Sequence, residues 1–369
     1  MKKAPWGWII FAALAAYPLL GADGYLTAKT GVPLEKQFTT IFIFALLSLG
    51  LNVVVGQAGL LQLGIAAFFA IGAYVTGILT VSVYPFQVGF WGALVIAPIV
   101  AGLAGVVLAA PTLRLRGDYL AIVTLGFGEV VRVTLINLEE ITGGPRGLNP
   151  LPPPWVPGFM KDGLGWKVGE DGFLGIRSDF YIYYVALAAL VGTVLLLRVI
   201  ERSRIGRSWI AIREDELAAT CMGINAVRTK LSAFAMGAAL AGLAGVLYAT
   251  KLTTTAEPNT YDFNYSIMVL CCLIIGGLGS TPGVLLGAFV LLGFDNVLTP
   301  LMTKLIQKSF GDLGTNVMAA PSNWRWIIFG AALVLMMRYR PEGIIPSKRA
   351  KLELHEEKTD PEVNRVGVE

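Results

Sequence analysis

Histidine, cysteine and charged residues are all scarce in this sequence. Its 369 residues contain one histidine, His355, and three cysteines, Cys221, Cys271 and Cys272. Two cysteines are adjacent and the third is distant, so neither a disulfide framework nor a zinc-binding spacing is visible. The single histidine stands in a charged segment near the C-terminus. Histidine-based catalysis and histidine metal sites are therefore not expected.

Charged residues make up only 15% of the chain, against about 25% in average soluble proteins, whereas hydrophobic residues make up 55%. This balance excludes a disordered chain, a coiled coil and an ordinary cytosolic enzyme. The sequence also lacks the phosphate-binding pattern G-x-x-x-x-G-K-[ST], the pattern H-E-x-x-H and paired catalytic carboxylates. We therefore expect no catalytic residue, metal or cofactor in this chain, and no contact with nucleic acid.

Long uncharged runs dominate what is present. No charge lies between Gln37 and Leu113, and the run from Phe263 to Phe294 is also uncharged. In lipid, backbone donors and acceptors must be satisfied internally, so such runs predict helices; the alternating pattern of a membrane barrel is absent. The sequence predicts an all-α polytopic membrane protein with about ten transmembrane helices. They are expected near residues 6–22, 38–55, 59–81, 90–111, 118–137, 179–198, 230–250, 263–278, 282–300 and 324–339.

The distribution of Lys and Arg predicts the orientation. With the N-terminus inside, the cytoplasmic segments hold most of the 29 Lys and Arg residues, so both termini are expected in the cytoplasm. The stretch 6–22 is interpreted as a retained helix, because it lacks a clear cleavage site. Residues 1–346 then form the transmembrane domain, with an outer loop at 139–178 and a cytoplasmic segment at 201–229. Residues 347–369 form a charged cytoplasmic tail that is expected to be disordered.

The cytoplasmic segment has the pattern of a short helix. Ser208 is expected to cap it, Trp209 to Met222 has helical composition, and Gly223 is placed to end it. A polar patch follows the first turn and comprises Arg213, Glu214, Asp215 and Glu216. Two interpretations stay open: a solvated amphipathic loop helix, or a lever that contacts a cytoplasmic protein. The outer loop is likewise either a passive connector or a docking surface for an external partner.

Glycines and one charge pair mark further candidates within the spans. Helix breaks are expected at two groups of glycines, which either line a pathway or allow tight helix packing. These are Gly56, Gly59 and Gly64, and Gly276, Gly277 and Gly279. Glu129 and Arg132 are three residues apart, so they share a helix face and can pair. An intramembrane charge indicates function, whereas the alternative is a structural ion pair that orients the helix.

A set of motifs follows in one order along residues 40–345. They are Leu51–Leu60, Arg114–Arg132, Thr142–Gly147, Ile205–Glu216, Gly223–Asn225, Lys230–Tyr248, Gly276–Ser280 and Arg340–Gly343. Together they resemble the LivM-type permease subunits of branched-chain amino acid ABC importers. The older E-A-A-x-x-x-G permease loop is only partly matched, by Glu216, Ala218, Ala219 and Gly223.

This resemblance implies a transport role in a bacterial or archaeal cytoplasmic membrane. It implies a second, LivH-like permease, two ATP-binding subunits that carry ATP and Mg²⁺, and an extracytoplasmic solute-binding protein. Residues 205–223 would be the helix that couples the permease to the ATPases. Permeases for urea and short-chain amides are of the same type, so they remain an alternative. A secondary transporter or channel acting alone is the alternative from another class.

Overall fold

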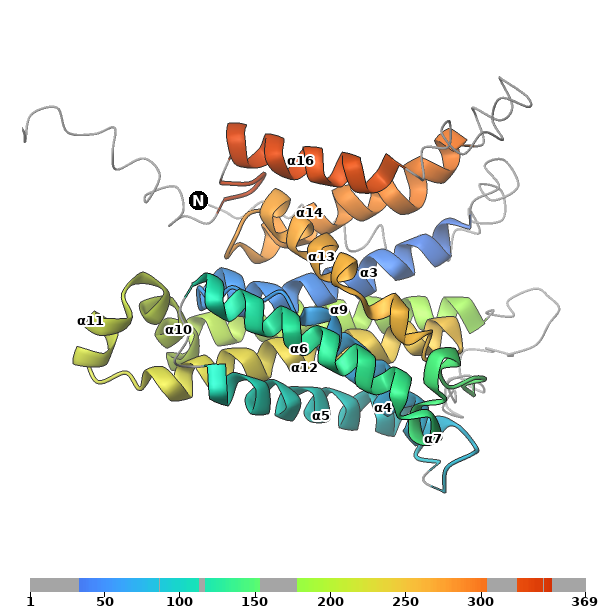
Figure 1. Ribbon diagram of the computed structural model, residues 1–369. Helices are drawn as coiled ribbons and strands as arrows, with labels where there is room; N and C mark the ends of the chain where they lie inside the picture. The colour runs from blue at the N-terminus through green and yellow to red at the C-terminus, as the bar shows by residue number, and fades with distance from the viewer. Residues whose placement is uncertain are drawn as a thin grey trace, which may run out of the picture.

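The computed structural model describes residues 33–85, 87–112, 117–152, 178–303, 324–340 and 342–346. Every regular element among these residues is a helix (Figure 1). Six helices are long and apolar enough to cross a membrane, and three shorter apolar helices accompany them. The chain therefore has the helices of a multi-pass membrane protein.

Helical elements of different lengths follow one another along the described residues. The first is α3 (Leu34–Leu51), which continues into the π-helical segment η1 (Asn52–Gln57). Next come α4 (Ile65–Thr80), α5 (Gly89–Thr112), α6 (Asp118–Asn137), the short α7 (Glu139–Thr142) and the 3₁₀ turn η2 (Gly144–Arg146). The middle of the chain forms α9 (Ser178–Arg202), α10 (Arg204–Glu214), α11 (Glu216–Cys221) and α12 (Ala226–Leu252). The last elements are η3 (Pro258–Tyr261), α13 (Phe263–Gly276), α14 (Thr281–Gly293), the π-helical η4 (Phe294–Leu298) and α16 (Arg325–Tyr339).

Nine of the ten expected spans coincide with helices. The remaining expected span, 6–22, lies outside the described residues. So do the tail 347–369 and residues 153–177 of the outer loop. The count of ten spans and the position of the termini therefore stay predictions. Several helix bounds differ from the expected spans, as at α4, which begins at Ile65. Helix α9 extends to Arg202 and α12 begins at Ala226, so both helices reach into the segment 201–229.

Helices α3 and α12 form the centre of the bundle, and they are the most buried of the long helices. Helix α12 packs chiefly against α5, α4 and α3. The contact with α4 is close because Gly72 meets the backbone of Gly242, where a Cβ would overlap it. Small residues allow such backbone approach in membranes, since apolar burial alone does not drive helix association there. Helix α6 is the least buried of the long helices.

Helices α13 and α14 form a tight pair joined by a sharp turn. Ser280 caps α14 by accepting a hydrogen bond from the Gly283 amide (3.3 Å), and Pro282 lies in its first turn. Gly276 and Gly287 face the partner helix so closely that a Cβ would overlap its backbone. The chain therefore breaks between α13 and α14 at Gly277 and Gly279, and Gly276 allows the two helices to approach closely.

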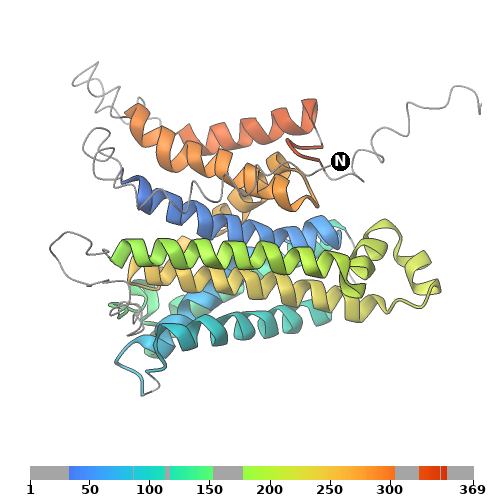
Figure 2. The ribbon, with the colours of Figure 1, turned by 180° about the vertical axis from the view of Figure 1, so that it is seen from behind.

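The α10–α11 segment projects from one end of the bundle, beyond the neighbouring helices (Figures 1 and 2). The opposite end carries α7, η2 and the connection from α12 to α13. There the backbones of residues 148–151 and 253–255 are hydrogen-bonded, as between Leu151 N and Thr253 O (2.8 Å). These contacts order the first part of the predicted outer loop.

Candidate functional site

The projecting segment consists of two helices rather than the single one that the sequence predicted. Ser203 caps α10 by accepting from the Gly206 amide (3.4 Å), and Asp215 caps α11 by accepting from the Leu217 and Ala218 amides (2.7 and 3.0 Å). Ser208 lies inside α10, where its hydroxyl donates to Arg204 O (2.9 Å). The prediction that Ser208 is the cap was wrong, because α9 runs on to Arg202 and only the turn at Ser203 separates it from α10.

Trp209 anchors the segment to the bundle. Its side chain is fully buried, and Nε1 donates to Ser232 Oγ of α12 (2.9 Å). In contrast, the apolar side chains of Leu217 and Met222 are 75% and 84% exposed. Helix α11 ends just before Gly223, whose backbone lies in the left-handed region (φ 85°), as predicted. The segment thus has a fixed root and an apolar, exposed tip.

The four residues of the predicted polar patch have separate contacts. Glu216 pairs with Lys230 of α12 (2.6 Å), and Asp215 is occupied as the cap of α11. Glu214 is exposed. Arg213 turns toward the membrane-spanning helices, where Nη1 donates to the carbonyl of Gly56 in η1.

Arg213 lies between the two groups of glycines that the sequence predicted as helix breaks. A Cβ at Gly59 would stand 2.8 Å from the Arg213 side chain, and one at Gly279 would stand 3.0 Å from Nη1. Only glycine leaves this room. The predicted break residues Gly56, Gly59 and Gly279 therefore meet the α10–α11 segment at one place.

Several polar side chains also belong to this contact region, which we call the Arg213 cluster. Its members are Asn52, Gly56, Gln57, Gly59, Glu201, Arg213, Gly279 and Thr281. Glu201 Oε1 accepts from Gln57 Nε2 (2.9 Å) and from Thr281 Oγ1 (2.7 Å), and Asn52 Oδ1 accepts from the Gly279 amide (3.0 Å). The cluster joins η1, the end of α9, α10 and the turn between α13 and α14.

Residues 342–346, which follow α16, pack against the α13–α14 turn. The amides of Ile344 and Ile345 donate to the carbonyls of Ile275 and Gly276 (2.9 and 3.1 Å), which end α13. Gly343 lies against Gly277 so closely that a Cβ would overlap its backbone. These bonds satisfy carbonyls that a helix end otherwise leaves open.

The other predicted residues lie elsewhere. Gly64 packs against the Thr124 carbonyl of α6. Glu129 and Arg132 pair as predicted (Nη2–Oε2 2.8 Å), and Arg132 Nη1 also donates to Asn259 Oδ1 in η3 (2.7 Å). In the connection from α12 to α13, burial raises the pKa of Tyr261 well above its usual value, and its hydroxyl donates to Thr255 O (2.6 Å).

Comparison with known proteins places the chain. Residues 34–337 match the family described as the permease component of branched-chain amino acid transport systems. The chain belongs to this family. It is 39% identical over 326 residues to the high-affinity branched-chain amino acid transport system permease protein LivM of Escherichia coli K12, covering 86% of this chain and 71% of LivM. LivM of Salmonella typhimurium is 38% identical over the same shares.

A more distant relative matches a similar share of this chain. LivH of Escherichia coli K12, also named as a high-affinity branched-chain amino acid transport system permease protein, is 24% identical over 85% of this chain and 95% of its own length. No solved structure matches the chain significantly. The matched family is a permease component rather than a catalytic subunit, and the described part of this permease holds no group of three or more His, Cys, Asp or Glu side chains that could bind a metal.

Sequence reasoning missed half of the Arg213 cluster in this permease. Asn52, Gln57, Glu201 and Thr281 were not singled out, although Asn52 and Gln57 stand as polar residues in an uncharged run. That polarity was the available signal. Glu201 and Thr281 gave none, since their meeting depends on how α9 and α14 pack.

Proposed function

We propose that this chain is a membrane-spanning subunit of an ATP-driven importer for branched-chain amino acids in a bacterial or archaeal cytoplasmic membrane. Membership of the permease family supports this role, and LivM, to which the chain is 39% identical, is named for that transport. ATP and Mg²⁺ bind to two separate ATPase subunits, a LivH-like permease completes the membrane part, and a solute-binding protein docks outside. Both termini lie in the cytoplasm.

The α10–α11 segment is the proposed contact with the ATPases. The observation that carries this assignment is the Arg213 contact, because it links a projecting segment with exposed apolar side chains directly to the breaks in two membrane-spanning regions. Movement of the segment by ATPase closure would pull on the Gly56 carbonyl of η1 and on the α13–α14 turn. Alternating access then follows from rearrangement of these breaks.

The region of the break between η1 and α4 contains buried polar side chains, which such a rearrangement needs. Asn52 Nδ2 and both polar side-chain atoms of Gln62 are buried without a hydrogen-bond partner among the described residues. Buried polar atoms are almost always paired in a settled structure. Their presence in η1 and in the connection from η1 to α4 supports a second arrangement in which they are satisfied.

Uptake of labelled solute tests the proposal. Cells with and without this gene should differ in ATP-dependent uptake of leucine and not of urea. Loss of urea uptake alone would replace the substrate and keep the coupling argument, because permeases for urea and short-chain amides are of the same type. Loss of neither would contradict the proposed substrate class.

A further inference from the structure

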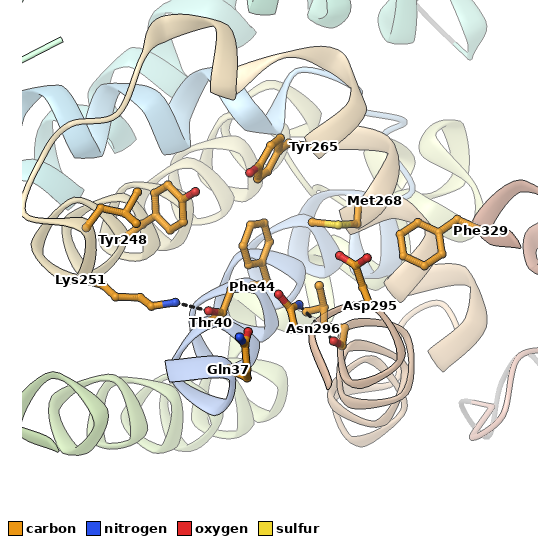
Figure 3. Close-up of a pocket in the computed structure, with 12 residues that line it drawn as sticks. Gln37, Thr40, Phe44, Tyr248, Lys251, Tyr265, Met268, Asp295, Asn296 and Phe329 are labelled. Carbon is orange, nitrogen blue, oxygen red and sulfur yellow. Dashed lines mark hydrogen bonds between the residues drawn. The ribbon is translucent and has the colours of Figure 1, made fainter. Parts of the chain in front are cut away.

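A cavity of about 280 Å³ lies in the half of the bundle opposite the α10–α11 segment. It is bounded by α3, α12, α13, the α14–η4 region and α16, which come from distant parts of the sequence (Figure 3). Pockets for drug-sized ligands span about 300–1,000 Å³, so this volume suits a smaller solute. The Arg213 cluster contributes no residue to its wall.

The wall of the cavity carries one cation and one anion. Lys251 stands near the end of α12, and its Nζ donates to Thr40 Oγ1 of α3. Asp295 enters from the other side in the view of Figure 3. Charged side chains within membrane-spanning regions face the bundle interior or a cavity, and they mark solute pathways. Both charges here belong to the wall of the same space.

The rest of the wall combines polar side chains with an apolar surface. Phe44, Met268, Leu292 and Phe329 supply aromatic and aliphatic surface, and Phe44 projects between Lys251 and Asp295 in Figure 3. A cation, an anion and an apolar surface are the three features that a zwitterion with an aliphatic side chain requires. A solute with a single charge would meet one group of like sign.

The local backbone near Asp295 departs from regular α-helix. Residues Phe294–Leu298 form the π-helical η4, and Pro300 follows it. Proline has no amide N–H, and its ring crowds the carbonyl four residues earlier, which accounts for the irregular turn. Isolated π turns are frequent at functional sites. This one bears two adjacent polar residues of the wall, Asp295 and Asn296.

We propose that this cavity is a binding site for the zwitterion of a small apolar amino acid, with the carboxylate at Lys251, the ammonium at Asp295 and the side chain against Phe44 and Met268. The proposal rests on the proposed function and assigns its solute to specific residues. Phe44 and Gly56 lie on one continuous helix, Leu34–Gln57, and are about 18 Å apart along it. A bound solute therefore touches the same helix that Arg213 holds.

Thiol protection tests the site in the transporter assembled with its partner subunits. A Cys221→Ser background removes the exposed native cysteine, while Cys271 and Cys272 are buried. Asn296→Cys is then labelled with a water-soluble thiol reagent, with or without leucine. Leucine at about ten times its Kd should slow labelling about tenfold, since only empty sites react. Labelling of Glu257→Cys, in the outer connection, should not change.

Single-charge analogues assign the two ends of the solute. In the parent, 4-methylpentanoate and isopentylamine should protect less well than leucine, because each lacks one ion pair. Asp295→Asn should raise the leucine concentration for half-protection about tenfold, the usual cost of one charged hydrogen bond, and leave that of 4-methylpentanoate unchanged. Lys251→Gln should do the same for leucine and leave isopentylamine unchanged. Glu257→Gln is the matched control.

The outcomes separate the site from the wider function. Absence of leucine protection in a transporter that still imports leucine with ATP overturns the site and leaves the proposed function standing. Unchanged half-protection in both charge variants also overturns it, and a lowered thermal midpoint in them would then assign the two charges a structural role. If Asn296→Cys does not assemble, Met268→Cys replaces it with the same expected protection.

Discussion

Arg213 illustrates how one side chain can connect two parts of a membrane protein. Its guanidinium donates to the Gly56 carbonyl, and its stem packs on Gly59. In the same cluster the Glu201 carboxylate accepts from Gln57 and Thr281. Sequence reasoning found Arg213 and the glycines as separate candidates. It could not join them, because nothing local in either segment indicates that α10 ends against η1 and the α13–α14 turn.

Replacing Arg213 should weaken both stability and coupling. Arg213→Ala leaves the buried Gly56 carbonyl without its partner, which costs about 1–3 kcal/mol. We expect a lower thermal midpoint of the purified protein and a loss of ATP-driven leucine uptake. Arg207→Ala is the matched control, since its Nη1 also donates to a backbone carbonyl, Arg202 O (2.8 Å), but in an exposed position. Equal effects of the two variants would contradict the assigned role.

The Glu129–Arg132 pair makes a second prediction at this scale. Neutralising one partner leaves a lone charge on a membrane-spanning helix, whereas neutralising both leaves none. We therefore expect Glu129→Gln and Arg132→Gln each to lower the thermal midpoint more than the double variant does. The side chains are 40% and 26% exposed, so the effect should be modest. A double variant that is worse than either single one would indicate separate roles.

At the scale of elements, hydropathy predicts where helices lie and says little about how they end. The expected span 90–111 became α5, Gly89–Thr112, because a helix is the only way to satisfy the backbone of an apolar run in lipid. The break at Asp215 was missed, since the composition of residues 209–222 is helical throughout. Ser208 was wrongly predicted as the N-cap of α10, because either Ser203 or Ser208 can cap a helix by residue type. The length of α9 decides between the two serines.

The break at Asp215 gives a test that separates capping from charge. Asp215→Ala removes the acceptor of two amides, at a cost of about 0.5–2 kcal/mol, and should loosen α11 and weaken retention of the ATPase subunits in a pull-down. Asp215→Asn keeps a good cap without the charge, so retention should stay near that of the parent. If the asparagine variant fails as the alanine variant does, the charge itself is required.

The exposed Glu214 next to it tests the surface directly. Charge reversal at Arg213, Glu214 or Asp215 should weaken ATPase association, but only Glu214→Lys does so without removing the Gly56 contact or the α11 cap. We expect reduced pull-down of the ATPase. Unchanged association would remove Glu214 from the contact surface.

At the scale of the whole molecule, the described charges within spans are few, which argues against transport by the chain alone. A proton-coupled carrier needs a relay of ionisable groups across the membrane. Glu129 is paired with Arg132, and Asp295 lies on a different helix at the cavity. The purified chain in liposomes should therefore carry no leucine, with or without a pH gradient. The assembled transporter should do so when ATP is enclosed with the ATPases, and leucine entry through the lone chain would favour a channel or secondary transporter.

The contact of residues 342–346 with α13 also sets an order of events during synthesis. The α13–α14 turn leaves the ribosome well before Ile344 and Ile345, so its carbonyls at Ile275 and Gly276 wait for partners until α16 has also been made. A chain that stops at a nonsense codon shortly before residue 342 would still contain every described membrane span. The carbonyls of Ile275 and Gly276 would then lack their hydrogen-bond partners. Residues 342–346 thus report that every described span has been made, and a copy that stops before them presents an open helix end to quality-control proteases.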